Sequence, residues 1–99
     1  MVKHTVMFQL YGGPEERRRV ALELREALMA LPAVIEPLVS IEVGINENPA
    51  EQWDLVLTAL LPDMESVPVY AKHPAHVDVV TRLLSKYQKT RACVDYYCD

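Results

Sequence analysis

Two hydrophobic periodicities alternate along the chain, one typical of strands and the other of helices. Residues 2–11 alternate, with apolar side chains and His4 on one face and polar side chains on the other, which predicts a first strand. Residues 39–45 alternate in the same way, residues 53–61 are apolar on both faces, and residues 90–98 predict a last strand. Because burial on both sides favours such a two-faced apolar strand, we expect residues 53–61 at the centre of the sheet.

Helical spacing appears in the segments between these strands. One helix is expected to begin at Pro14 and to end at Pro32, since apolar residues recur every three to four positions: Val20, Leu24, Leu28 and Leu31. A second helical region follows residue 61 and is interrupted by Pro74, which disfavours the helical conformation at the preceding residue. From Pro74 a helix is predicted to run to Tyr87, with an inward stripe made of His76, Val79, Val80, Leu83, Leu84 and Tyr87.

The resulting order is β-α-β-β-α-β, which is the pattern of an α+β ferredoxin-like fold with helices on one face of an antiparallel sheet. The 99 residues predict a single domain over 1–99, and 51% of them are hydrophobic, which is rich for this size. Helices cover one sheet face, so the apolar residues on the other face need a second partner. We therefore predict a homodimer in which two sheets pair face to face into a barrel.

Charge and cysteine content narrow the functional classes. A net charge of −4 argues against a nucleic-acid partner, and no apolar run is long enough to span a bilayer. Met1 leads directly into strand-like alternation without a signal-peptide pattern, so a cytoplasmic location is expected. Cys93 and Cys98 are five residues apart in a strand, about 16 Å if extended, which predicts reduced thiols with no disulfide between them. Neither has a His or a second Cys at ligand spacing in the sequence, so no metal site is expected there.

The candidate chemistry lies in the segment Tyr70-Ala71-Lys72-His73-Pro74-Ala75-His76. Because Pro74 separates two helices, Tyr70 and His76 can face one space, and His4 joins them if its strand packs against the helix stripe. Burial lowers the pKa of an imidazole, so a histidine there is neutral and able to act as a general base. A tyrosine hydroxyl beside it can donate to a developing oxyanion or enolate. This chemistry requires no metal and no cofactor.

Two other interpretations of the same residues are open. In a structural interpretation, His76 is a core histidine that is hydrogen-bonded to Tyr70, and His73 helps to cap a helix. In a metal interpretation, His73, His76 and His4 are ligands, but no carboxylate or cysteine with matching spacing completes that set. We therefore predict no metal.

Several short motifs, in this order and spacing, resemble those of the stress-responsive α/β-barrel family, called Dabb: Lys3-His4, Leu31-Pro32, Val43-Gly44-Ile45-Asn46, Tyr70 with His73-Pro74-Ala75-His76, and Val94-Asp95-Tyr96. The resemblance spans essentially the whole chain. It implies a ferredoxin-like fold, a homodimer through the sheets, and a pocket between sheet and helices. One relative in this family, a plant polyketide cyclase, uses a tyrosine and a histidine that fall on Tyr70 and His76, and His4 matches a pocket histidine. Leu24 and Leu55 stand where that cyclase has a pocket tyrosine and histidine, so a more apolar pocket is expected here.

These residues lead to two main functional hypotheses and a third, weaker one. The first is a cofactor-free lyase or cyclase that acts on a hydrophobic carbonyl compound, with His76 as base, Tyr70 as oxyanion donor and His4 as orienting group. The second is a non-catalytic barrel protein that binds a small hydrophobic ligand, and the third is a cofactor-free monooxygenase. In each case the residues predicted to line the pocket are Val6, Phe8, Leu24, Leu55, Leu57, Val80 and Leu83.

Overall fold

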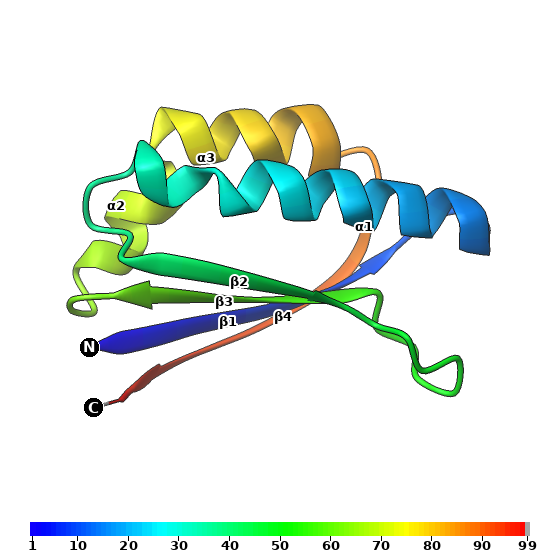
Figure 1. Ribbon diagram of the computed structural model, residues 1–99, viewed down its shortest axis with the longest axis horizontal. Coiled ribbons are helices and arrows are strands. Elements are labelled where there is room, and N and C mark those ends of the chain that lie inside the picture. The colour runs from blue at the N-terminus through cyan, green and yellow to red at the C-terminus, as the bar shows by residue number, and fades with distance from the viewer. Residues whose placement is uncertain (99) are drawn as a thin grey trace.

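Four antiparallel strands form one sheet in the computed structural model, which describes residues 1–98 (Figure 1). In chain order the strands are β1 Val2–Leu10, β2 Ser40–Ile45, β3 Leu55–Leu61 and β4 Gln88–Tyr97. Their order across the sheet is β2-β3-β1-β4, which confirms the central position predicted for the third strand. The first and last strands pair along their full lengths, so the two ends of the chain lie close together (Figure 1).

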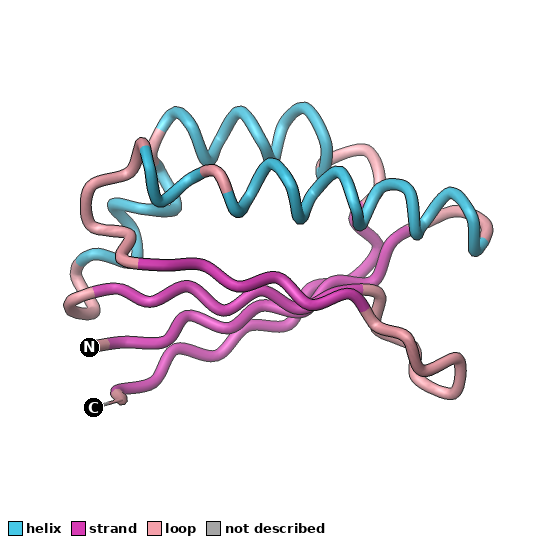
Figure 2. Tube along the Cα trace, in the orientation of Figure 1, coloured by secondary structure: helices cyan, strands magenta, loops and turns pink. Residues whose placement is uncertain are grey.

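The helices pack on one face of this sheet, as Figure 2 shows, and this confirms the α+β ferredoxin-like arrangement. They are α1 Pro14–Met29, a 3₁₀ turn η1 Leu31–Ala33, α2 Ser66–Lys72, α3 Pro74–Val79 and a π-helical turn η2 Val80–Leu84. Pro14 occupies the start of α1 as predicted. The predicted end at Pro32 was wrong, because α1 stops at Met29 and Pro32 instead lies in the first turn of η1, where its missing N–H is tolerated.

The long helix predicted from Pro74 to Tyr87 was also wrong in its second half. After α3, the amide of Ser85 donates to the carbonyl of Val80, which is an i→i+5 bond that widens the turn. The chain leaves this turn earlier than predicted, and β4 begins at Gln88. The wider turn changes which side chains of η2 face the sheet.

The core lies between the sheet and the helices and follows the alternation of β1. Its helix-facing residues are buried, and those between them are only partly covered. This burial pattern continues on β3, whereas nearly every residue of β4 is exposed. The helices therefore cover three strands and leave the edge strand β4 open, which determines where a cavity in this layer meets solvent.

No helix in the described part of the chain covers the opposite sheet face. Val94 and Tyr96 on β4 are 56% and 45% exposed there, and they continue an apolar surface that includes Met7, Val56 and Leu60. An exposed apolar surface of this kind is typical of an interface. Within residues 1–98, no helix has the length and apolar character needed to cross a membrane.

Candidate functional site

A cavity of about 490 Å³ lies between the sheet and the second helical region, beside the open edge strand. Its lining combines apolar side chains from β1, β3, α1 and α3 with polar side chains from β4. Of the residues that the sequence placed in a pocket, the cavity wall includes His4, Val6, Phe8, Leu24, Leu57, Tyr70, His76 and Val80.

Two predicted pocket residues lie elsewhere. Leu55 is buried in the core opposite Phe8 in the sheet and does not line the cavity. Leu83 lies in a shallow groove between α1 and η2, beside Ala27 and Ala30. The wide turn of η2 accounts for this second error, because it brings Leu84 rather than Leu83 to the cavity wall.

The proline break directs two functional side chains at one space. His73 is extended (φ −61°, ψ 135°), so α2 ends there and α3 begins at Pro74 in a new direction. The rings of Tyr70 and His76 consequently lie 4.6 Å apart between centroids, and the ring of His4 lies 5.8 Å from that of Tyr70. The structure thus brings together all three residues that the sequence singled out.

His73 does not belong to this group. Its Nδ1 accepts a 3.0 Å hydrogen bond from the amide of Ala75, which confirms its predicted role as a helix cap. The metal set of His73, His76 and His4 is therefore not assembled, since His73 is absent from the cavity wall.

The hydroxyl of Tyr70 is buried and has no hydrogen-bond partner among residues 1–98. Tyr70 is only 1% exposed, and this burial raises the pKa of its hydroxyl to about 12, so the group stays a proton donor. A buried polar group without a partner costs about 1–3 kcal/mol in the free protein. The hydrogen bond between Tyr70 and His76 that the structural interpretation requires is not present.

His76 has a defined tautomer instead. Its Nδ1 lies 2.8 Å from the carbonyl oxygen of Ala71, and because a carbonyl only accepts, Nδ1 carries the proton and Nε2 is left as an acceptor. Burial lowers the pKa of His76, with a smaller opposite effect from the Ala71 hydrogen bond. The net lowering of the pKa favours the neutral imidazole, in which Nε2 is the acceptor.

His4 is paired with a residue that sequence reasoning did not identify. Its Nδ1 lies 2.5 Å from Oδ1 of Asp95, which stands directly opposite it in the β1–β4 register. Two positions earlier on the same face of β4, Sγ of Cys93 lies 3.6 Å from the same Nδ1. Cys93 therefore has a histidine neighbour that sequence spacing did not indicate, because neighbours across a sheet are set by strand register. Alternation along residues 90–98 was the one sequence signal that could have indicated these two residues, since it places Cys93 and Asp95 on one face of the strand.

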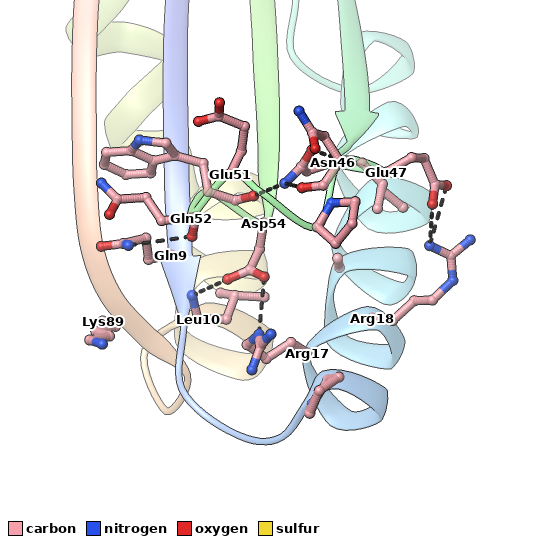
Figure 3. A pocket seen from close by; sticks show the side chains of 16 residues that line it. Gln9, Leu10, Arg17, Arg18, Asn46, Glu47, Glu51, Gln52, Asp54 and Lys89 are labelled. Carbon is pink, nitrogen blue, oxygen red and sulfur yellow. Dashed lines mark hydrogen bonds and ion pairs between the residues drawn. The ribbon is translucent and has the colours of Figure 1, made fainter.

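A second, more polar pocket of about 700 Å³ lies at the other end of the sheet (Figure 3). Four of its charged groups are already paired with one another. The carboxylate of Asp54 accepts from the amide of Leu10 at 2.7 Å and from Nε of Arg17 at 3.1 Å, and Arg18 pairs with Glu47 at 3.1 Å. These contacts hold the loop before β3 against β1 and α1. Because these contacts brace a loop, the cavity beside Tyr70 is the better candidate site.

An antiparallel sheet with helices on one face, and an apolar cavity holding a tyrosine and two histidines, define a ferredoxin-like α+β barrel protein. The chain belongs to the stress-responsive A/B barrel domain family, Dabb, whose model matches residues 2–98. No curated protein matches the sequence.

Solved structures agree with this assignment. A dimeric protein of unknown function with a ferredoxin-like fold from Bacteroides fragilis is 41% identical, with a TM-score of 0.90 over 96% of this chain and 93% of that one. An Arabidopsis thaliana protein is 25% identical, with a TM-score of 0.79 over 100% and 96% of the two chains. An antibiotic biosynthesis monooxygenase shares the fold at 14% identity, with a TM-score of 0.78 over 100% and 99%.

Proposed function

We propose that the cavity binds a hydrophobic carbonyl compound and catalyses cofactor-free acid–base chemistry of the cyclase or lyase type. The observation that carries this proposal is the buried hydroxyl of Tyr70, which has no partner among the described residues and lies beside an imidazole whose Nε2 is an acceptor. Because burying such a hydroxyl is costly, a ligand oxygen that accepts its hydrogen bond would recover that cost on binding.

The first step would be removal of a proton next to the carbonyl. Nε2 of His76 accepts the proton from the carbon, and the electron pair moves onto the carbonyl oxygen to form an enolate. The hydroxyl of Tyr70 donates a hydrogen bond to that oxygen, where the negative charge develops. The enolate carbon can then attack a second carbonyl, which closes a ring, or expel a leaving group. The apolar part of the wall lowers the local dielectric around these groups, which strengthens both interactions.

His4 would act as a positioning residue. Its pairing with Asp95 holds the ring in one orientation against the edge of Tyr70, 5.8 Å between centroids. A carboxylate that accepts from one imidazole nitrogen sets which tautomer is present and where the other nitrogen points. His4 and Asp95 together would therefore maintain the shape of the cavity floor.

A non-catalytic binding protein is the second candidate. The size and largely apolar wall of the cavity suit capture of a hydrophobic small molecule without any reaction. In either case we propose a homodimer through the uncovered sheet face, supported by its exposed apolar side chains and by the dimeric Bacteroides fragilis relative. Cofactor-free oxygenation is the third candidate and rests only on a fold shared with a monooxygenase. A cytoplasmic location stays a prediction from the sequence.

Deuterium exchange separates the first two candidates without knowledge of the product. A series of apolar 1,3-dicarbonyl compounds is incubated in D₂O with the wild-type protein, His76→Ala, Tyr70→Phe and the control His73→Ala. Loss of the α-proton signal is followed by NMR, and binding is measured in parallel. We expect exchange with wild type and His73→Ala, and a loss of about 100-fold or more in His76→Ala.

The other outcomes are decisive as well. Saturable binding with no exchange above the buffer rate would favour the non-catalytic function. Unchanged exchange in His76→Ala would overturn the role of His76 as base. Absence of both binding and exchange across the series would overturn the proposal of a carbonyl-binding cavity.

A further inference from the structure

Three different metal-binding side chains converge at the edge of the cavity, on the side formed by β4. His4, Cys93 and Asp95 each offer a ligand atom, and these atoms all lie within 4.8 Å of one another. They come from two paired strands: His4 stands opposite Asp95, and Cys93 stands opposite Val6. Because backbone hydrogen bonds hold both strands in register, the three Cβ positions are fixed before any ion binds.

Two of the three distances between these atoms are close to those in a tetrahedral zinc site. Bond lengths of about 2.3 Å to sulfur and about 2.0–2.1 Å to nitrogen and oxygen put tetrahedral ligands roughly 3.4–3.6 Å apart. Sγ of Cys93 lies 3.6 Å from Nδ1 of His4 and 4.0 Å from Oδ1 of Asp95. Nδ1 and Oδ1 lie 2.5 Å apart, so their hydrogen bond would have to open by about 1 Å. We infer that a rotation of the partly exposed Asp95 carboxylate supplies this change.

We propose that His4, Cys93 and Asp95 form a binding site for a divalent transition-metal cation with the ligand preference of zinc. One nitrogen, one sulfur and one oxygen are the donors that such a borderline cation accepts, and they do not suit Mg²⁺ or Ca²⁺, which take oxygen ligands. A thiolate and a carboxylate together balance the +2 charge. Three protein ligands leave the fourth position open to water or an anion, as in catalytic zinc sites.

Proton transfer accompanies binding at this site. The S–H bond of Cys93 breaks as the metal–sulfur bond forms, and that proton leaves to bulk solvent. His4 binds through Nδ1, so its proton moves from Nδ1 to Nε2 and the imidazole stays neutral. No group is oxidised or reduced. Net binding therefore releases one proton per metal ion.

Arg91 lies two residues before Cys93 on the same face of β4, and its positive charge opposes a nearby cation. We therefore expect reversible binding, weaker than in a structural zinc site with four protein ligands. The proposal does not depend on the roles proposed for Tyr70 and His76, but it shares His4 and Asp95 with that site, and metal binding would replace the hydrogen bond between them.

The test uses Co²⁺ and Zn²⁺ with the full-length protein. We expect Co²⁺ to produce the near-ultraviolet band of a cobalt–thiolate bond, saturating at one ion per chain, and Zn²⁺ to displace it. Removal of one ligand in Cys93→Ser or Asp95→Asn should weaken binding by at least about 10-fold, and Cys93→Ser should also abolish the band. Cys98→Ser is the matched control and should bind as wild type does.

A second measurement needs only the wild-type protein. Zn²⁺ should slow alkylation of Cys93 and leave the alkylation of Cys98 unchanged, as read by peptide mass spectrometry. Absence of the thiolate band, an unchanged affinity in Cys93→Ser, or equal protection of both cysteines would overturn the proposal. The deuterium-exchange assay above uses no metal, so either proposal can fail without the other.

Discussion

Tyr70→Phe should make the ligand-free protein more stable while weakening its function. The side chain of Tyr70 is only 1% exposed, and the substitution removes its hydroxyl, which has no hydrogen-bond partner among residues 1–98. Leaving such a group unsatisfied costs about 1–3 kcal/mol, whereas loss of one oxygen's packing contacts costs a few tenths of a kcal/mol. We therefore expect the free energy of unfolding to rise by about 1 kcal/mol or more.

Urea denaturation of the two proteins measures this difference. Because dimerisation makes apparent stability depend on concentration, wild type and variant must be compared at one protomer concentration. A gain of about 1 kcal/mol corresponds to a rise in Tm of roughly 4–8 °C for a domain of this size. Tyr11→Phe is the matched control, since Tyr11 is 56% exposed and its hydroxyl is open to solvent. The free energy of unfolding of that control should stay within about 0.5 kcal/mol of the wild-type value.

The sign of the change in the free energy of unfolding shows whether the Tyr70 hydroxyl is unpaired in the free protein. If Tyr70→Phe lowers the free energy of unfolding by about 1 kcal/mol or more, the hydroxyl makes a hydrogen bond in the free protein. The reasoning from an unpaired donor to a ligand oxygen would then be refuted. A stabilised variant that also loses binding or exchange would identify Tyr70 as a residue retained for function at a cost in stability.

Two further predictions concern pH and assembly. Burial lowers the pKa of His76, so an NMR titration should place its midpoint below the ordinary value of about 6.5. The neutral ring therefore contributes stability above a pH of about 6.5, and this contribution is lost as the pH falls through the lowered pKa. His76→Gln should remove this dependence of stability on pH. A midpoint above about 6.5 would contradict the desolvated position inferred for His76. Val94→Lys places a charge on the uncovered sheet face and should convert the proposed dimer to a monomer in sedimentation analysis. Val77→Lys, at an exposed position on α3, is the control and should leave assembly unchanged. A Val94→Lys variant that is still dimeric would exclude that face as the interface.

Much of the fold can be predicted from the chain alone. Alternation in residues 2–10 determines which face of β1 is buried, because side chains in a strand point to opposite faces in turn. Pro74 marks a helix boundary, because its ring disfavours a helical conformation at His73. The C-terminal end of α1 and the π turn of η2 were not predictable in this way, since local preferences differ little there and packing against the sheet decides between them.

Some residues of the candidate site could also be predicted from the sequence, and others were decided only by the tertiary structure. Sequence patterns were sufficient to select His4, Tyr70 and His76, because unusual side chains stand out against regular apolar spacing. Strand register alone decided that Asp95 and Cys93 meet His4, since 91 and 89 residues of chain separate these pairs. The unpartnered state of Tyr70 was likewise decided only by tertiary structure. A hydroxyl finds or lacks a partner according to which elements pack around it, and no local pattern along the chain encodes that packing.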